Sequence, residues 1–312
     1  MNRYVSPEQS GYVLGSLNMD LVIRAPRHPR PGETLVGSDF GMFPGGKGAN
    51  QAVAVARLGQ PVTMIGCVGR DAFGDALIAT LQAAGVDTTG VARADAATGV
   101  ALITLSAAGE NTIVVAPGAN GAVTPELVRM HEPLMAGAAA LLLQLEVPLP
   151  AVETAIRLAR SHGVPVILNP APARPLPAEL IAQVDYLIPN QHEAALLTGL
   201  PVHSPEEAQM AAEVLRRSGA GVVVLTLGEQ GALVLADGEP VHVPAFPVEV
   251  VDTTAAGDAF VGAFAVALSE GRAPVEAATW GCAAGALACT VLGAQPSLPT
   301  RTAVLRLVTG DE

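Results

Sequence analysis

Hydrophobic residues along the chain form short continuous runs that alternate with longer segments in which apolar residues recur every third or fourth position. The short runs predict strands buried on both faces, and the periodic segments predict amphipathic helices. Strands are predicted at residues 12–15, 62–66, 140–145, 164–169, 186–189, 222–227 and 232–235. Helices are predicted at residues 49–58, 73–84, 151–161, 206–217 and 260–268. This alternation is typical of an α/β fold with a doubly wound, mostly parallel sheet between two helical layers.

Two regions, residues 21–43 and 99–116, interrupt the alternation. They read as strands and hairpins without a crossover helix, and a turn is predicted at residues 107–111. We expect them to form a small β-sheet lid over the carboxyl ends of the main strands, where ligands bind in such folds. No flexible linker or internal repeat divides the chain, so residues 1–312 are predicted to form a single α/β domain.

The composition excludes several classes of partner. A net charge of −12 and an excess of acidic residues disfavour nucleic acid and anionic membrane surfaces. The amino-terminal residues contain no apolar signal segment, and the uncharged Ala/Gly-rich stretch at 277–292 is predicted to be a buried helix rather than a membrane span. Cys67, Cys282 and Cys289 form no even disulfide set and no CxxC pair, which favours reduced thiols and a cytoplasmic location.

A glycine-rich segment at residues 41–50 contains Lys47, the only lysine of the chain. It approaches the phosphate-loop pattern, but Gly48 stands where a hydroxyl should bind magnesium, and no clear central strand precedes it. Gly45, Gly46 and Gly48 instead offer a backbone surface for a polyhydroxylated ligand, with donors from Lys47 and Asn50 beside it. A tight turn that caps the following helix is the alternative.

A second segment, residues 251–260, leads into an apolar helix. The small residues Ala255, Ala256 and Gly257 would leave backbone N–H groups free at the helix start, where an anion can bind. Asp258 in the first turn would then lie beside a phosphoryl group and accept the proton of an attacking hydroxyl. Its alternative role is to complement the helix dipole.

Other polar residues follow predicted strands at their carboxyl ends. Asn18 and Asp20 alternate after the first strand and can face one vicinal diol, unless they serve a turn. Glu146 follows the strand at 140–145 and can accept from a sugar hydroxyl or order magnesium. The segment 226–231 is either an ordinary connection between strands or a loop around a nucleotide.

Together these segments resemble the ribokinase family of sugar kinases, within the PfkB superfamily, from residue 11 to residue 299. The resemblance rests on GSLNMD at 15–20, PGET at 31–34, GGKGANQA at 45–52, LNPAPAR at 168–174, PN at 189–190, DTTAAGD at 252–258 and GAQPS at 293–297. It implies transfer of the γ-phosphate of ATP to a sugar hydroxyl, with Asp258 as base and Ala255, Ala256 and Gly257 as an anion hole.

The resemblance also implies the remaining site residues. The sugar would be held by Asn18, Asp20, Gly46, Lys47, Gly48, Asn50, Glu146 and Asp258. ATP would be held by Asn190, Thr226, Leu227, Gly228, Glu229, Gln230, Gly231, Gly257 and Cys282, the last standing where the family often has an adenine-contacting histidine. Mg²⁺ would be bound largely through the nucleotide phosphates. K⁺ would be bound by Asp252, Thr254, Ala288, Val291, Gly293 and Ser297.

The substrate most consistent with the sequence is ribose, because an Asn18 that bonds a 2-hydroxyl penalises a sugar lacking it. Deoxyribose, keto-deoxygluconate, fructose and a nucleoside such as adenosine remain alternatives. A dinucleotide oxidoreductase is disfavoured because no GxGxxG follows the first strand, and a non-catalytic sugar sensor is disfavoured by Asp258. An exposed lid predicts a homodimer in which two lids cover each other.

Overall fold

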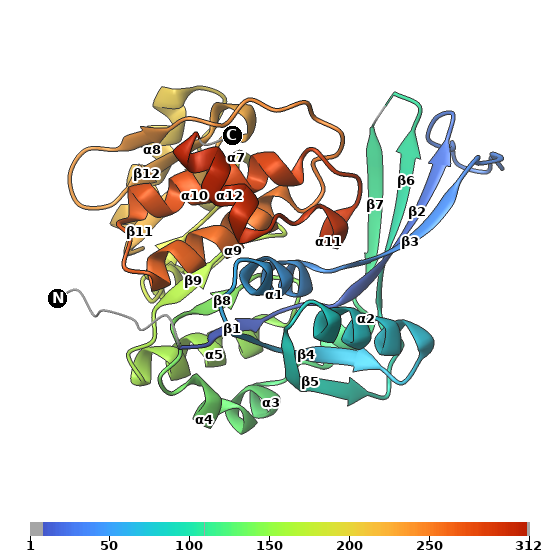
Figure 1. Cartoon of the computed structure of the whole chain (residues 1–312), viewed down its shortest axis with the longest axis horizontal. Coiled ribbons are helices and arrows are strands. Elements are labelled where there is room, and N and C mark those ends of the chain that lie inside the picture. Colours follow the sequence, from blue (N-terminus) through green and yellow to red (C-terminus); the bar gives the residue numbers. More distant parts are fainter. Residues whose placement is uncertain (1–8, 109, 311–312) are drawn as a thin grey trace.

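The computed structural model describes residues 9–108 and 110–310 and contains a large sheet and a small one (Figure 1). The large sheet has the strand order β13-β12-β11-β10-β9-β8-β1-β4-β5. Its strands are β1 (Gly11–Leu14), β4 (Val62–Gly69), β5 (Asp87–Ala94), β8 (Leu141–Leu143), β9 (Val166–Leu168), β10 (Tyr186–Leu187), β11 (Val222–Thr226), β12 (Ala232–Leu235) and β13 (Val241–Val243). All neighbours from β11 to β5 pair in parallel, and β12 and β13 add an antiparallel edge.

The large sheet is buried on both faces, as the continuous apolar strands predict. Val13 and Met64 face one hydrophobic core, whereas their chain neighbours Leu14 and Ile65 face the other. The first core is covered by α1 (Lys47–Arg57), α2 (Ala72–Ala83), α9 (Ala256–Ser269), α10 (Pro274–Ala288) and α12 (Arg301–Thr309). The second is covered by α3 (Pro125–Met130), α4 (Glu132–Met135), α5 (Leu149–Ser161), α6 (Ala178–Ile181), α7 (Gln191–Thr198) and α8 (Pro205–Arg217).

Helices α1 and α9 lie side by side on the first face (Figure 1). Their backbones approach closely because Gly262 has no side chain: a Cβ there would lie 2.5 Å from the Cβ of Ala54. Asn50 stands four residues before Ala54, and Asp258 stands four residues before Gly262. The hydrogen-bonded pair Asn50 and Asp258 therefore lies one helical turn from this packing contact. The glycine contact thereby determines where Asp258 sits.

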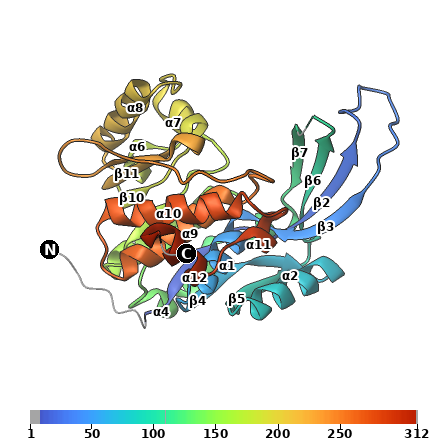
Figure 2. The same cartoon turned by 45° about the horizontal axis from the view of Figure 1, so that its top comes forward.

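The small sheet, called the lid below, has the order β3-β2-β6-β7 and stands away from the main body (Figure 2). It consists of β2 (Asn18–Ala25), β3 (Phe40–Gly45), β6 (Gly99–Ser106) and β7 (Asn111–Ala116). Strand β2 pairs in parallel with β6, and both hairpins are antiparallel. β2 follows β1 after three residues, so the lid grows directly from the carboxyl edge of the large sheet.

The predicted strands and helices are confirmed in kind, with ends that differ by a few residues. Strand β5 was not predicted, because its polar residues lie at the exposed edge of the sheet, where burial imposes no apolar pattern. Of the stretch at 277–292, residues 277–288 belong to the buried helix α10, whereas residues 289–292 follow its end and include the exposed Val291 and Leu292. None of the helices in the described part of the chain is long and apolar enough to span a bilayer. Two predictions include residues outside the described ones. The predicted single domain includes residues 1–8, 109 and 311–312, and the predicted turn at 107–111 includes residue 109.

Candidate active site

The residues predicted to act together come from distant parts of the chain and meet beside the carboxyl ends of the parallel strands. Asn18 and Asp20 begin β2, Glu146 follows β8, and Asp258 lies in the first turn of α9. Lys47 interacts electrostatically with the three carboxylates of Asp20, Glu146 and Asp258. The structure therefore brings together the acidic residues and the single lysine that the sequence separates by more than two hundred positions.

Asp258 is buried and held by two amides of α1. Asn50 Nδ2 donates to its Oδ2 at 2.9 Å, and Gln51 Nε2 donates to its Oδ1 at 3.1 Å. Burial raises the pKa of Asp258 above its ordinary value, while Lys47 and the two amides oppose that rise. A carboxylate with a raised pKa and a fixed orientation is suited to accept a proton near neutral pH.

The start of α9 has an unusual backbone. Ala255 has φ 61°, the only left-handed conformation of a non-glycine residue in the described chain. The Ala256 amide donates to the Thr253 carbonyl at 3.2 Å, so it is not the free donor that the sequence suggested. In the described residues the Gly257 and Asp258 amides find no protein acceptor, and they remain available for an anion. Strain of this kind is commonly retained where function requires it.

Glu146 and Lys47 are fixed by the loop between β1 and β2. Ser16 Oγ donates to Glu146 Oε2, and the Lys47 backbone N–H donates to the same oxygen at 3.1 Å. Burial alone would lower the pKa of Lys47, but Asp258, Glu146, Glu193 and Asp20 raise it above its ordinary value. The ammonium therefore stays charged among these carboxylates.

Asn18 and Asp20 are both buried at the base of the lid. Asn18 Oδ1 accepts from Asn120 Nδ2 at 2.7 Å, and Asn120 also bonds the Leu17 backbone N–H and carbonyl. This fixes the Asn18 amide so that its Nδ2 is the group left to donate. Burial, followed by Glu146 and Asp258, raises the pKa of Asp20 to about 7, against the opposing charge of Lys47.

Two adjoining cavities border these residues. The larger, of about 550 Å³, lies between the lid and the segments 250–254 and 292–294, and Asp20, Val22 and Arg24 line it from β2. The smaller, of about 210 Å³, is lined by Lys47, Asn190, Glu193, Thr226, Gly257 and Asp258, among others. The carboxylate of Asp258 thus belongs to the smaller cavity, and that of Asp20 to the larger.

The predicted nucleotide residues are only partly gathered around the smaller cavity. Asn190 caps α7 and shares a reciprocal capping box with Glu193, which engages both ends of its amide. Thr226 ends β11 and lines the cavity, and residues 227–231 form the turn into β12, in which Leu227 N–H donates to Gly231 O. Cys282 is buried in the core and lines neither cavity; burial raises the pKa of its thiol to about 12.

Of the residues expected to hold K⁺, Asp252, Thr254 and Gly293 line the larger cavity, whereas Ala288, Val291 and Ser297 do not. Asp252 accepts hydrogen bonds from the Thr254 amide and hydroxyl at 2.9 and 2.7 Å and from the Gly293 amide at 2.8 Å. Burial would raise the pKa of Asp252, but these hydrogen bonds lower it below its ordinary value. Ser297 is buried and donates to Ala294 O, and the Ala288 carbonyl accepts from Val291 N–H. The Asp252 carboxylate is thus anionic and holds together two segments, 252–254 and the one that contains Gly293.

Comparison with known proteins identifies the family. The sequence pattern of the pfkB family carbohydrate kinases matches residues 9–301. The chain belongs to this family. The kinase is 43% identical to a ribokinase of Haemophilus influenzae over 95% of this chain and 97% of that protein. It is 41% identical to a deoxyribokinase of Salmonella typhimurium over 81% of this chain and 83% of that protein. The structure of an Arabidopsis thaliana ribokinase complexed with ribose and ATP superimposes with a TM-score of 0.90 at 34% identity, covering 96% of this chain and 98% of that one.

The kinase is therefore a phosphotransferase that acts on a sugar hydroxyl, with the predicted ribokinase-like α/β fold. The roles of individual residues are predictions from their chemistry and geometry. Among the described residues no cluster of three or more His, Cys, Asp or Glu side chains could hold a metal ion.

Several residues of the kinase site were not singled out from the sequence: Ser16, Gln51, Asn120, Gln144 and Glu193. Ser16 and Gln51 lie within the motifs at 15–20 and 45–52, so they could have been predicted as site residues from the sequence. Asn120 lies outside the recognised motifs, and Gln144 ends an apolar run two residues before Glu146; only their burial and hydrogen bonds reveal them. Glu193 was detectable, because Asn190 followed three residues later by a glutamate is the capping-box pattern.

Gly48 of the kinase lets the backbones of α1 and of the loop after β1 pack closely, in addition to its predicted role in sugar binding. A Cβ at Gly48 would lie 2.6 Å from the backbone of Gly15, and one at Gly15 would lie 2.1 Å from Gln144 Oε1. These two glycines let the loop after β1 lie directly on the start of α1. At this close approach the Gly48 amide donates to Ser16 Oγ and the Ala49 amide donates to Ser16 O.

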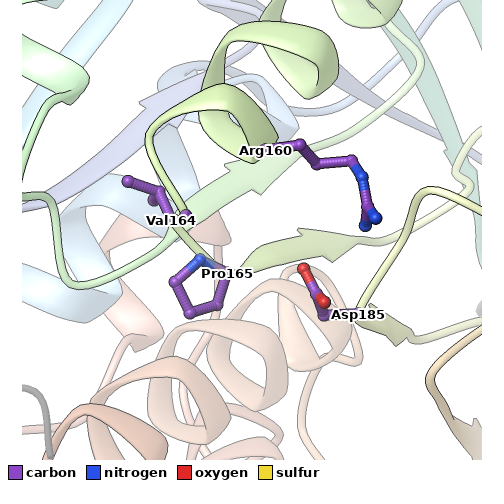
Figure 3. Close-up of a pocket in the computed structure, with 5 residues that line it drawn as sticks. Arg160, Val164, Pro165 and Asp185 are labelled. Atoms are coloured by element: carbon purple, nitrogen blue, oxygen red, sulfur yellow. The ribbon is translucent and has the colours of Figure 1, made fainter. Parts of the chain in front are cut away.

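A further shallow pocket of about 240 Å³ lies at the opposite edge of the large sheet, at the amino ends of β9 and β10 (Figure 3). Arg160 and Asp185 line it with Gly163, Val164 and Pro165. Arg160 already donates to Gln183 O at 3.2 Å, and Asp185 accepts from Val166 N–H at 2.8 Å. The Arg160 contact ties α5 to the segment before β10, and the Asp185 contact ties that segment to the start of β9, which accounts for both charged residues.

Proposed function

We propose that this kinase transfers the γ-phosphate of ATP to the 5-hydroxyl of D-ribose, forming D-ribose 5-phosphate and ADP. The observation that carries the proposal is the buried Asp258, fixed by two amides beside unpartnered helix amides and within electrostatic range of the Asn18/Asp20 end of the site. ATP would place its phosphates in the smaller cavity, and ribose would lie between that cavity and the lid.

In the proposed reaction Asp258 accepts the proton of the 5-hydroxyl as its oxygen forms a bond to the γ-phosphorus. The bond from that phosphorus to the bridging oxygen of ADP breaks at the same time. The Gly257 and Asp258 amides at the start of α9 and the Lys47 ammonium would stabilise the charge on the transferring group. A positioned base contributes roughly 10²- to 10⁴-fold to such a reaction.

The polar groups at the base of the lid support ribose over a deoxy sugar. Asn120 holds Asn18 so that its Nδ2 donates, and the carboxylate of Asp20 accepts, which matches two neighbouring hydroxyls. A sugar without the 2-hydroxyl would leave one buried polar group unpaired. Deoxyribose is the second candidate, because a deoxyribokinase is nearly as similar to this chain as the ribokinase is.

The charges around the larger cavity do not support a sugar acid. Arg24 lines that cavity, but Asp39 and Asp252 line it as well, and Arg27 is paired with Glu33 at 2.7 Å. A substrate carboxylate there would meet more negative than positive charge. The arrangement therefore supports a neutral sugar over keto-deoxygluconate.

Two cations complete the proposal. Mg²⁺ would bind the ATP phosphates, and Glu193 and Asn190 line the cavity in which those phosphates would lie. K⁺ would bind Asp252, Thr254 and the carbonyls near Ala288, Val291, Gly293 and Ser297. It supplies no proton or bond; it would hold the segment 252–254, which leads into the start of α9.

We also propose a homodimer formed through the lids. On the lid face that points away from the larger cavity, Met42, Leu21, Leu102 and Val114 stand opposite one another on four neighbouring strands. Met42, Leu102 and Val114 are 56%, 52% and 66% exposed. A second copy would cover this apolar row, and sedimentation of wild type as a monomer at micromolar concentration would contradict it. A cytoplasmic location stays a prediction from the sequence.

The test is ATP-dependent phosphorylation of ribose, deoxyribose, fructose, keto-deoxygluconate and adenosine, in KCl or NaCl, by wild type and Asp258→Asn. We expect ribose to be the best substrate, turnover to rise with K⁺, and Asp258→Asn to lose about 10²-fold or more in kcat. Preference for another sugar would keep the mechanism and replace the substrate. Absence of turnover with all five would favour a sugar sensor.

A further inference from the structure

Two buried glutamine side chains, Gln51 and Gln144, are linked by hydrogen bonds to Asp258. Gln51 is on α1, one residue after Asn50, and Gln144 follows β8. Both are completely buried, and neither lines either of the two cavities described above. A buried primary amide is retained only where its hydrogen bonds offset the loss of water.

The two amides form a directed chain that ends on the base. Gln144 Nε2 donates to Gln51 Oε1, and Gln51 Nε2 donates to Asp258 Oδ1 at 3.1 Å. The Gln51 Nε2 also lies 3.4 Å from Asn169 Oδ1. Turning the Gln51 amide over would place its oxygen against the carboxylate, and turning that of Gln144 would place two carbonyl oxygens together. The carboxylate of Asp258 therefore sets the orientation of both amides.

This chain of hydrogen bonds leaves one buried polar atom without a hydrogen-bond partner. Gln144 Oε1 has no hydrogen-bond partner in the described residues and lies against Gly15, where any Cβ would clash with it. A hydrophobic residue at position 144 would remove that unpaired oxygen, but it would also leave Gln51 without the donor that orients it. Packing alone does not account for a glutamine here.

We propose that Gln51, oriented by Gln144, is a positioning residue that holds the Asp258 carboxylate ready to receive the proton of the substrate hydroxyl. The inference rests on the proposed function, in which Asp258 is the base. With Gln51 bonded to Oδ1 and Asn50 bonded to Oδ2, rotation of the carboxylate is blocked. The remaining lone pairs then face the smaller cavity, which Asp258 lines.

Loss of the Gln51 hydrogen bond has a predictable effect on titration. The bond stabilises the ionised carboxylate, so its removal raises the pKa of Asp258 further. The charged groups that face this site are Lys47, Glu146, Asp20 and Glu193, and all are retained in a Gln51 variant. Because the base works only when ionised, the acidic limb of the kcat profile should move to higher pH.

The experiment compares Gln51→Met, Gln144→Met and the double variant with wild type. Methionine keeps the length of the side chain and removes both polar groups. Gln60→Met is the matched control, since Gln60 is a buried amide bonded to Ser269 Oγ and to Gln9 O, outside the site. Steady-state kcat and KM for ribose are measured from pH 5.5 to 9, with circular dichroism and thermal unfolding to verify folding.

We expect Gln51→Met to lower kcat between about 10-fold and 100-fold, with KM for ribose within threefold. The acidic limb of its kcat–pH profile should shift to higher pH by about one unit. Gln144→Met should show the same changes at smaller size, and the double variant should be no worse than Gln51→Met, because Gln144 acts through Gln51. Gln60→Met should keep kcat within twofold of wild type.

A folded Gln51→Met with wild-type kcat and an unmoved limb would overturn the proposal, as would additive losses in the double variant. If Gln51→Met does not fold, Gln144→Met alone must lower kcat and move the limb. If wild type phosphorylates no sugar, the proposed function fails separately. The pKa of Asp258, followed by ¹³C NMR of the carboxyl with Asp258→Asn for assignment, then decides: a higher value in Gln51→Met supports the inference, and an unchanged value overturns it.

Discussion

Replacing Asp20 with asparagine is expected to stabilise the ligand-free kinase and to weaken its binding of ribose. The pKa of Asp20 rises from 3.8 to about 7 on folding, because the side chain is buried and because Glu146 and Asp258 repel its charge. Ionising it in the folded protein therefore costs free energy. A shift of about three pKa units at about 1.4 kcal/mol each is a destabilisation of about 4 kcal/mol when the group is fully ionised.

The sign of this effect gives it a distinct pH dependence. Because the folded pKa lies above the unfolded value, the destabilisation is absent below pH 3.8, grows as the pH rises toward 7, and is constant above that. The gain in unfolding free energy from Asp20→Asn should therefore be about 2–3 kcal/mol larger at pH 8 than at pH 5. Urea unfolding of both proteins at the two pH values measures it.

Asp39→Asn is the matched control, since it removes an exposed carboxylate that lines the same cavity and makes the same change in net charge. Ribose titrations by calorimetry without ATP add a second readout. In the proposed function the ionised Asp20 accepts from the sugar, so the affinity of wild type for ribose should rise about tenfold from pH 6 to pH 8. An advantage of Asp20→Asn that is equal at both pH values would refute the reasoning.

Three further predictions concern the backbone and the cation. Ala255→Gly should change the unfolding free energy by less than about 1 kcal/mol in urea, whereas Ala255→Val should lose about 1–3 kcal/mol, because φ is 61° there. Gly15→Ala should lower both kcat and the calorimetric Tm, since the new Cβ would lie 2.1 Å from Gln144 Oε1; overpacking of this kind costs about 1–3 kcal/mol. Asp252→Ala should remove the stimulation by KCl over NaCl in the kinase assay while sugar affinity, measured by calorimetry, stays within about threefold.

The sequence predicted the elements of the main sheet because burial on both faces forces continuous apolar strands, such as β8 and β11. It missed β5, whose polar residues lie at the sheet edge. It predicted that a helix begins at the small residues around Asp258, which is confirmed, but it assigned a free amide to Ala256, which bonds Thr253 instead. Backbone torsions of one turn decide such details, and residue types do not encode them uniquely.

What the sequence determined by itself was the family, the fold class and the residue types that carry the chemistry, because motifs and periodicity are local properties of the chain. What only the tertiary structure decided was which side chains meet. Asn120 orients Asn18, and Gln144 orients Gln51, across separations of about a hundred residues. Their role depends on burial and on the close approach of backbones at glycines such as Gly15 and Gly48, where a Cβ would clash. Those contacts arise when the sheet, the helices and the lid are brought together, so no segment of the chain reveals them alone.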